Sequence, residues 1–267
     1  MIDSVIKRNN VNVIGNGDQV ILFAHGFGCD QNAWKFVTDA FTDDYKVVLF
    51  DYTGSGKSDV TQYSPAKYNS LDGYAQDVLD ICEALEIKDA IFVGHSVSSM
   101  VGILAANIHP GYFSKLVFIG PSPRYLNAEN YTGVFEQKDL EGLFEFMENN
   151  YLGWSSAMAP AIMGNADRPE LGEFLAASFC STDPDVAKDF ARVTFMSDNR
   201  ADLSKLKVSS LTLQCSDDII APTVVGQYVH QHIPGNQFIQ LSAAGHCPHI
   251  SEPGETIAAI RSFIRQN

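Results

Sequence analysis

The stretch that decides the fold is Ala90-Ile-Phe-Val-Gly-His-Ser-Val-Ser98, an apolar run that ends in a Gly-x-Ser-x-small motif. An apolar strand followed at once by this motif, and then by a helical pattern, is typical of a nucleophile elbow. In such a turn the serine hydroxyl stands at the carboxyl end of the strand and faces a cleft. We therefore predict that Ser96 is a nucleophile. Ser98 stands where the motif usually has its last glycine.

Other short apolar runs predict a sheet around this strand. They are rich in Val, Ile, Leu and Phe, and near-continuous apolar runs suit strands that are buried on both faces. The runs lie at 20–24, 46–50, 90–93, 115–119, 210–214 and 237–241. Helical patterns separate them, for example at 70–85 and 255–264. This alternation predicts an α/β fold with a mostly parallel, doubly wound sheet.

The middle of the chain has a different pattern. From about residue 121 to about residue 198 the strand-like runs stop, and helical patterns rich in Phe, Met and Tyr take their place. A helical insertion between two strands is expected to cover the active-site face as a lid; the alternative is that it only completes the core. We divide the chain into core residues 1–120, a helical lid at 121–198 and core residues 199–267.

A reactive serine needs a base, an acid that orients the base, and donors for the oxyanion. Candidates follow later strands in the chain order serine, acid, histidine. Asp217 and Asp218 come after the fifth apolar run, and His246 comes after the sixth. Because the carboxyl ends of parallel strands meet at one edge of the sheet, these side chains are expected near Ser96. Spacing alone does not separate the two aspartates.

The loop after the first apolar run, Phe23-Ala-His-Gly-Phe-Gly28, has the position and composition of an oxyanion site. Its glycines let the backbone N–H of Phe27 turn inward, and the N–H of Val97 directly follows the nucleophile. We predict both as oxyanion donors; the alternative for this loop is a plain turn. His95 is predicted to point away from the serine and to serve in packing.

Composition narrows the expected partners. The formal net charge of −14 repels nucleic acid and anionic membranes, so we expect neither as a partner. The five cysteines form no Cys-x-x-Cys pair, and the histidines lack metal-ligand spacing, so we expect no metal and no cofactor. Gly56-Lys-Ser58 ends like a phosphate loop, but the glycine required five residues earlier is Asp51. Without a signal peptide or membrane span, a cytoplasmic location is expected.

Several motifs together resemble a known family. Those similar to α/β-hydrolases in general are His25-Gly-Phe-Gly28, Asp51-x-x-Gly-x-Gly-x-Ser-Asp59, Gly94-His-Ser96 and Gly245-His246. Others, such as Phe27-Gly-Cys-Asp-Gln31, Gly120-Pro-Ser-Pro123 and Gln214-Cys-x-Asp-Asp-Ile-Ile-Ala-Pro222, resemble the RsbQ-like family of bacterial energy-stress regulators. The plant strigolactone and karrikin receptor hydrolases are relatives of that family. The resemblance covers nearly the whole chain.

The resemblance implies an α/β-hydrolase fold with a four-helix, V-shaped lid. It implies a catalytic triad of Ser96, Asp218 and His246, since the family's acid falls on the position before Ile219. It also implies a small apolar substrate pocket, for which the expected lining residues are Phe27, Tyr125, Phe135, Trp154, Met158, Phe195 and Ile219.

The same resemblance implies a function. We expect a serine hydrolase that acts on a small apolar ester or lactone-type ligand. Its turnover is expected to be coupled to stress signalling through a PAS-domain serine/threonine phosphatase (RsbP-like). The alternatives are a ligand-binding regulator with incidental turnover and a plain carboxylesterase.

Overall fold

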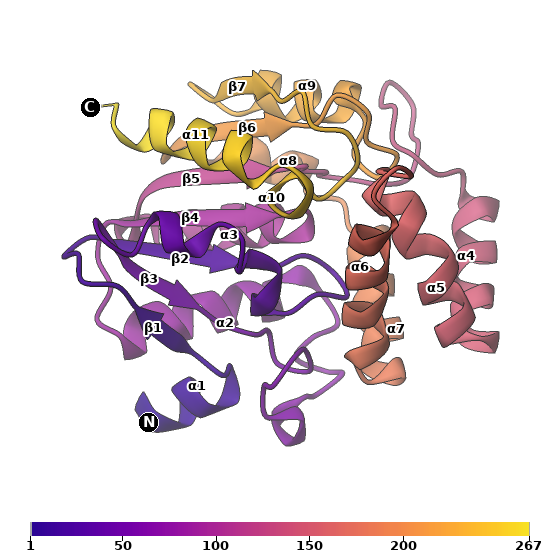
Figure 1. The fold of residues 1–267 in the computed structure, drawn as a ribbon, viewed down its shortest axis with the longest axis horizontal. Helices are drawn as coiled ribbons and strands as arrows, with labels where there is room; N and C mark the ends of the chain where they lie inside the picture. Colours follow the sequence, from indigo (N-terminus) through magenta and orange to yellow (C-terminus); the bar gives the residue numbers. More distant parts are fainter. Residues whose placement is uncertain (1, 267) are drawn as a thin grey trace.

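The computed structural model describes residues 2–266, and a seven-stranded sheet forms its centre (Figure 1). The strand order is β1-β3-β2-β4-β5-β6-β7, and every pair is parallel except β1 with β3. The strands are β1 (Asn12–Ile14), β2 (Val20–Ala24), β3 (Lys46–Leu49), β4 (Ala90–His95), β5 (Phe113–Ile119), β6 (Ser209–Gln214) and β7 (Gln237–Gln240). The predicted mostly parallel sheet is confirmed.

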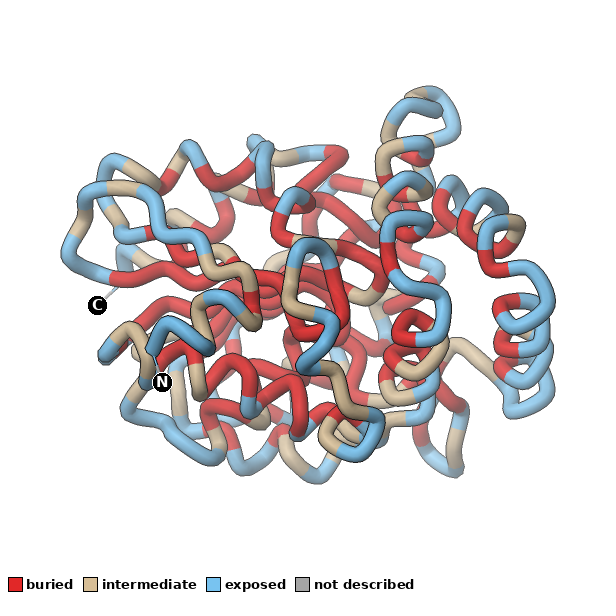
Figure 2. Tube along the Cα trace, turned by 90° about the horizontal axis from the view of Figure 1, so that it is seen from below, coloured by how far each residue is buried: buried red, intermediate tan, exposed pale blue. Residues whose placement is uncertain are grey.

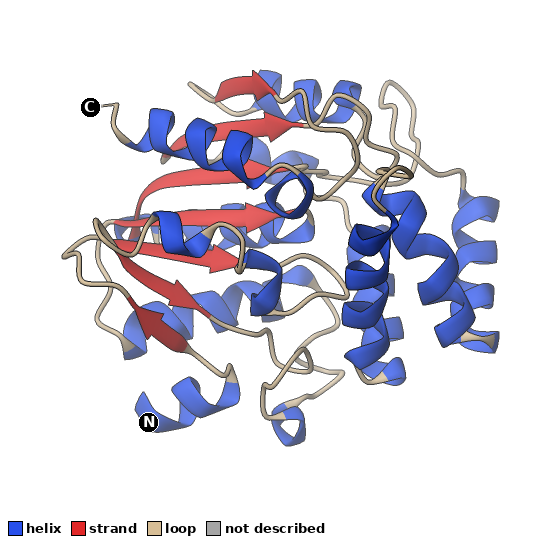
Figure 3. Cartoon of the chain, in the orientation of Figure 1, coloured by secondary structure: helices blue, strands red, loops and turns tan. Residues whose placement is uncertain are grey.

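Helices cover both faces of this sheet (Figure 3). On one face α2 (Leu71–Ala84), α3 (Val97–Ile108) and α9 (Thr223–His232) pack against strand residues such as Leu22 and Phe92. On the other face α11 (Pro253–Ile264) packs against their strand neighbours, including Ile21 and Ile91. Alternate residues of one strand thus enter two cores, which is why the apolar runs are continuous. Figure 2 shows the buried residues concentrated along the sheet and the helix sides that face it.

The structure also has shorter helices. The α-helices among them are α1 (Ile2–Arg8), α8 (Arg200–Leu203) and α10 (Pro248–Ser251). The 3-10 helices are η1 (Gln31–Trp34), η2 (Thr38–Ala40), η3 (Val60–Gln62) and η4 (Pro110–Tyr112). No helix among residues 2–266 is both long enough and apolar enough to cross a bilayer.

Four helices of 13 residues each stand between β5 and β6, beyond the carboxyl ends of the strands (Figure 1). We call them the lid helices: α4 (Gln137–Asn149), α5 (Tyr151–Met163), α6 (Pro169–Ser181) and α7 (Pro184–Met196). Local residues set their ends. The Asn150 side chain accepts a hydrogen bond from Gly153 N–H at the start of α5, and Gly164 ends α5 in the left-handed conformation. The Asp183 carboxylate caps α7.

Candidate active site

Ser96 stands on a sharp turn between β4 and α3, with φ 56° and ψ −122°. A non-glycine residue adopts this backbone conformation at a cost of about 1–3 kcal/mol, so the surroundings must hold it. The Ser96 N–H donates to the carbonyl of Ile119 on β5 at 2.8 Å. Gly94 permits the turn, because a Cβ there would lie only 2.6 Å from the Ser98 carbonyl oxygen. The strand and the turn together raise the serine side chain above the sheet edge.

His246 joins Ser96 to Asp218 by two hydrogen bonds. Its Nδ1 lies 2.7 Å from Asp218 Oδ2, and its Nε2 lies 2.8 Å from Ser96 Oγ. An ionised carboxylate only accepts, so Nδ1 carries the proton and Nε2 accepts from the serine hydroxyl. The N–H groups of Ile220 and Ala221 donate to Asp218 Oδ1 at 2.8 and 2.9 Å and fix the carboxylate. All three side chains are buried, which is the arrangement of a general base ready to activate a nucleophile.

The structure separates the two aspartates that spacing left equivalent. Asp217 is exposed, and only its backbone carbonyl enters the site, where it accepts from Gly245 N–H at 2.6 Å. Gly245 has φ +81°, and a Cβ there would lie 1.8 Å from the Met163 carbonyl oxygen, so this turn needs glycine. The next residue, His246, donates its backbone N–H to the Ile162 carbonyl of α5 at 2.9 Å. The imidazole is therefore carried on a loop that is tied to a lid helix.

Two backbone N–H groups near Ser96 are unused. Among residues 2–266, neither Phe27 N–H nor Val97 N–H has a protein acceptor. Val97 follows Ser96 at the first turn of α3, and Phe27 lines the same cavity as Ser96. Free N–H groups beside a nucleophile can bind an oxyanion, and the assignment of this role to Phe27 and Val97 stays a prediction.

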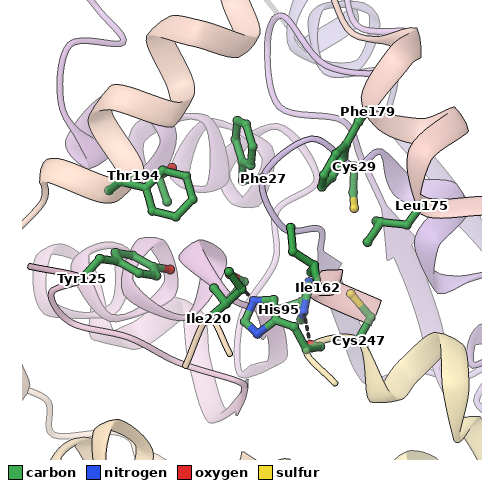
Figure 4. A pocket seen from close by; sticks show the side chains of 13 residues that line it. Phe27, Cys29, His95, Tyr125, Ile162, Leu175, Phe179, Thr194, Ile220 and Cys247 are labelled. Carbon is green, nitrogen blue, oxygen red and sulfur yellow. Dashed lines mark hydrogen bonds between the residues drawn. The ribbon is translucent and has the colours of Figure 1, made fainter. Parts of the chain in front are cut away.

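A cavity that Ser96 helps to line lies between the sheet edge and the lid helices (Figure 4). It holds about 390 Å³ of space free of protein atoms, part of it open to solvent. The lining residues are Phe27, Cys29, His95, Ser96, Tyr125, Ile162, Leu175, Phe179, Thr194, Phe195, Ile220, His246 and Cys247.

Comparison with known proteins places this site in a family. The family model described as "Alpha/beta hydrolase family" matches residues 21–260. The chain belongs to the alpha/beta hydrolase family. The motif-based resemblance at this level is confirmed, and the finer RsbQ-like assignment stays a prediction.

Three relatives match the hydrolase over nearly its whole length. It is 38% identical over 265 residues to "Karrikin insensitive 2 receptor CA" of Petunia hybrida, covering 98% of each chain. It is 37% identical over 264 residues to "Strigolactone esterase D14" of Arabidopsis thaliana, covering 98% of this chain and 97% of the other. A solved hydrolase from Oleispira antarctica is 42% identical, with a TM-score of 0.97 and coverage of 100% and 98%. The plant receptor hydrolases named from the motifs are therefore true relatives.

Three of the seven expected pocket residues line the hydrolase cavity: Phe27, Tyr125 and Phe195. Trp154 is not among these lining residues, and its ring packs against two that are, Phe27 and Phe179, at centroid distances of 6.1 and 5.5 Å. Phe135 is not among them either, and its ring packs edge-on against the lining residue Phe195 at 5.9 Å.

The remaining two expected residues, Met158 and Ile219, have neighbours that line the cavity. Met158 is half-buried and packs into the apolar cluster of the lid, while Ile162, one helical turn later on α5, reaches the cavity. Ile219 is 48% exposed, and its neighbour Ile220 takes the inward position. Sequence reasoning missed Leu175 and Phe179, although their i, i+4 spacing on a helical pattern is a signal for one helix face.

Phe27 links the hydrolase core to the lid. Its ring contacts Trp154 of α5, Phe179 of α6, and Phe190 and Phe195 of α7, all at centroid distances of 5.8–6.1 Å. Such tilted and edge-to-face contacts each contribute about 0.5–1.5 kcal/mol beyond area burial. One residue therefore offers its N–H to the site and its ring to three lid helices.

His95 does more than pack. Its ring lines the cavity, and its Nε2 lies 2.8 Å from the backbone carbonyl of His246. A carbonyl only accepts, so Nε2 carries the proton. Burial, and then the nearby His249 and His246, hold the pKa of His95 well below its usual range, so the ring is neutral. His95 thus supports the loop that carries His246. Among residues 2–266 no group of His, Cys, Asp or Glu side chains could hold a metal ion.

Proposed function

We propose that this protein is a serine hydrolase that cleaves small, mainly apolar esters or lactones. The observation that carries the proposal is the hydrogen-bonded series Ser96–His246–Asp218 at the base of a small apolar cavity. The esterase and receptor names of the relatives support the same reaction class.

The geometry accounts for each step of the reaction. Ser96 Oγ attacks the carbonyl carbon while His246 Nε2 takes its proton, and Asp218 stabilises the imidazolium. The oxyanion is bound by the N–H groups of Phe27 and Val97. His246 then gives the proton to the leaving oxygen, which for a lactone stays attached to the acyl group. Water repeats the sequence and releases the acid.

Two further polar groups face the cavity and favour a substrate with a second oxygen. Thr194 Oγ1 is buried and makes no hydrogen bond to any residue of the 2–266 range, while the buried Tyr125 hydroxyl lies beside the Ser96 hydroxyl. A buried polar atom without a partner costs about 1–3 kcal/mol, so a ligand atom that pairs with it binds more tightly. Burial raises the pKa of Tyr125, which keeps its hydroxyl a donor. The remaining lining is apolar apart from the side chains of Ser96 and His246, the His95 ring and the thiols of Cys29 and Cys247.

The reaction is tested by trapping the acyl-enzyme. The hydrolase is mixed with 4-nitrophenyl acetate and with both enantiomers of a butenolide lactone, quenched within the first turnover, and digested for mass spectrometry. An adduct is expected on Ser96, or on His246 after acyl transfer, and none is expected in Ser96→Ala. Hydrolysis by wild type without any adduct at this site would contradict the covalent mechanism.

We further propose that the hydrolase acts in the cytoplasm as a stress regulator with a PAS-domain serine/threonine phosphatase as partner. The motif resemblance to the RsbQ-like family supports this, as does the receptor name of a relative. The bond from His246 N–H to Ile162 of α5 supplies a physical route, because chemistry at the imidazole acts on a loop held by the lid.

This coupling predicts that tagged wild-type hydrolase co-purifies a PAS-domain phosphatase from energy-starved source cells. The Ser96→Ala variant is expected to lose ester hydrolysis. The phosphatase partner is expected to show no activity on phosphoserine peptides when this variant replaces wild type. Output that persists without hydrolysis would instead support a ligand-binding regulator with incidental turnover. Recovery of no phosphatase with wild type would support a plain carboxylesterase.

A further inference from the structure

Ser98, the residue that replaces the usual elbow glycine, makes two buried hydrogen bonds below the cavity. It is fully buried in the first turn of α3. Its Oγ lies 2.5 Å from the backbone carbonyl of His25 and 2.8 Å from the Tyr52 hydroxyl. The first bond reaches the loop after β2, and the second reaches the segment after β3. A glycine at this position would make neither bond.

The direction of every bond in this group follows from its chemistry. A carbonyl only accepts, so Ser98 donates to His25, and the Tyr52 hydroxyl must donate to Ser98. The backbone N–H of Tyr52 donates to His25 Nε2 at 3.2 Å, which places the imidazole proton on Nδ1. Nδ1 then donates to the Gly26 carbonyl at 2.9 Å. Burial lowers the pKa of His25, so its ring stays neutral with this one proton.

The last bond in the series sets the orientation of a catalytic donor. The Gly26 carbonyl and the Phe27 N–H belong to the same peptide group, which is planar and trans. Holding the carbonyl toward His25 therefore turns the Phe27 N–H in the opposite direction. Close packing against His95 also requires glycine at position 26, because a Cβ there would lie 2.5 Å from His95 Nδ1.

We propose that Ser98 is a positioning residue for the oxyanion site. With Tyr52 it holds His25, and His25 holds the peptide group that presents the Phe27 N–H. The inference rests on the proposed serine-hydrolase function and adds to it a residue that does not touch the substrate. It explains why the hydroxymethyl group is tolerated at the elbow: the side chain fills a hydrogen-bonding position that two strand ends share.

The experiment compares Ser98→Ala and Tyr52→Phe with the control Ser99→Ala. Ser99 is equally buried on the same helix turn, and its hydroxyl donates to the Gly94 carbonyl at 3.1 Å, so its bond returns to β4 and not to the oxyanion loop. The measurements are kcat and KM for 4-nitrophenyl acetate, the affinity for phenylboronic acid by calorimetry, and the melting temperature. The boronic acid forms a tetrahedral adduct on Ser96 and needs the oxyanion site without needing turnover.

Ser98→Ala is expected to lower kcat about 10- to 100-fold, a fraction of the loss when a whole oxyanion donor is removed. KM is expected within twofold, and phenylboronic acid affinity is expected to fall by the same factor as kcat. Tyr52→Phe is expected to show the same pattern more weakly, and the double variant to resemble Ser98→Ala because the residues act in series. Ser99→Ala is expected to lower the melting temperature while leaving kcat and boronic acid affinity within twofold.

Two outcomes would overturn the inference. One is a Ser98→Ala protein that loses stability but keeps kcat and boronic acid affinity. The other is equal losses of both quantities in Ser98→Ala and Ser99→Ala. A wild type that binds phenylboronic acid but cleaves no ester would count against the proposed function, while the affinities of the variants would still decide the role of Ser98.

Discussion

Asp218→Asn is expected to lower kcat by about four orders of magnitude, whereas Asp217→Asn is expected to leave kcat within a factor of two. An amide at 218 keeps an oxygen for the N–H groups of Ile220 and Ala221, so the fold is retained. Its NH₂ group then faces His246 Nδ1 and favours the tautomer with the proton on Nε2. That nitrogen can no longer accept the proton of Ser96. Asp217 uses only its backbone carbonyl, which asparagine retains.

The measurement is steady-state hydrolysis of 4-nitrophenyl acetate by the two variants and wild type, with melting temperatures as a check on folding. The adjacent positions make the pair a matched comparison, since both changes remove one formal charge from the same turn. A loss of activity in Asp217→Asn with an active Asp218→Asn would contradict the assignment of the acid.

Acidification from pH 6.5 toward pH 4 is expected to destabilise the fold steeply. Burial lowers the pKa values of His25, His95 and His249 in the folded protein, that of His249 to about 3. In the unfolded chain these residues take up protons near their ordinary pKa of 6.5, so the unfolded state binds more protons in this window. The free energy of unfolding therefore decreases as the pH is lowered, by up to about 1.4 kcal/mol per pH unit for each histidine.

Three such residues give a slope that approaches about 4 kcal/mol per pH unit, against a typical total stability of about 5–15 kcal/mol. Salt-bridged carboxylates act in a lower window. The Arg200 guanidinium lowers the pKa of Asp198 to about 2, so that its contribution is present above the ordinary carboxyl pKa and is lost only as the pH falls below about 3.8. The pKa of Glu255 is lowered from its ordinary value of 4.5, so the slope between pH 6 and 5 reports mainly on the histidines.

Urea unfolding at a series of pH values measures this slope, and His249→Phe is the test variant. Phenylalanine keeps a ring between Trp34 and His95, whose centroids lie 4.5 and 4.4 Å from that of His249. It removes one of the three titrations, so the slope is expected to fall by about one third. An unchanged slope in the variant, whatever its absolute stability, would contradict the origin proposed for the acid sensitivity.

Strands β2 to β5 were predictable because each holds an apolar run whose alternate residues enter two cores, and β2 matches its predicted bounds, Val20–Ala24. Strand β1 was not predictable, since its three residues are exposed and carry no apolar pattern. The serine and the histidine could be located because each follows a strand at one sheet edge. The choice between Asp217 and Asp218 depends on which carboxylate two backbone N–H groups hold, and spacing carries no information about that.

The cavity lining was harder to predict because it depends on how each lid helix is rotated about its axis. On α5, Trp154, Met158 and Ile162 lie on one face at i, i+4 spacing, yet only Ile162 lines the cavity. In the loop at Ile219 and Ile220, no periodicity indicates which side chain turns inward. Contacts between distant segments decide both outcomes.

Because the Phe27 ring contacts the lid helices and its N–H is a proposed oxyanion donor, the rate of hydrolysis is expected to depend on the position of the lid helices. Its ring contacts four aromatic side chains from α5, α6 and α7. Outward displacement of those helices would remove the ring contacts of Phe27, the residue whose N–H is proposed to bind the oxyanion. Both turnover and the position of the lid helices would then depend on Phe27, through its peptide group and its side chain respectively. A molecule that binds to the outer surface of the lid helices would change the rate of hydrolysis without entering the cavity.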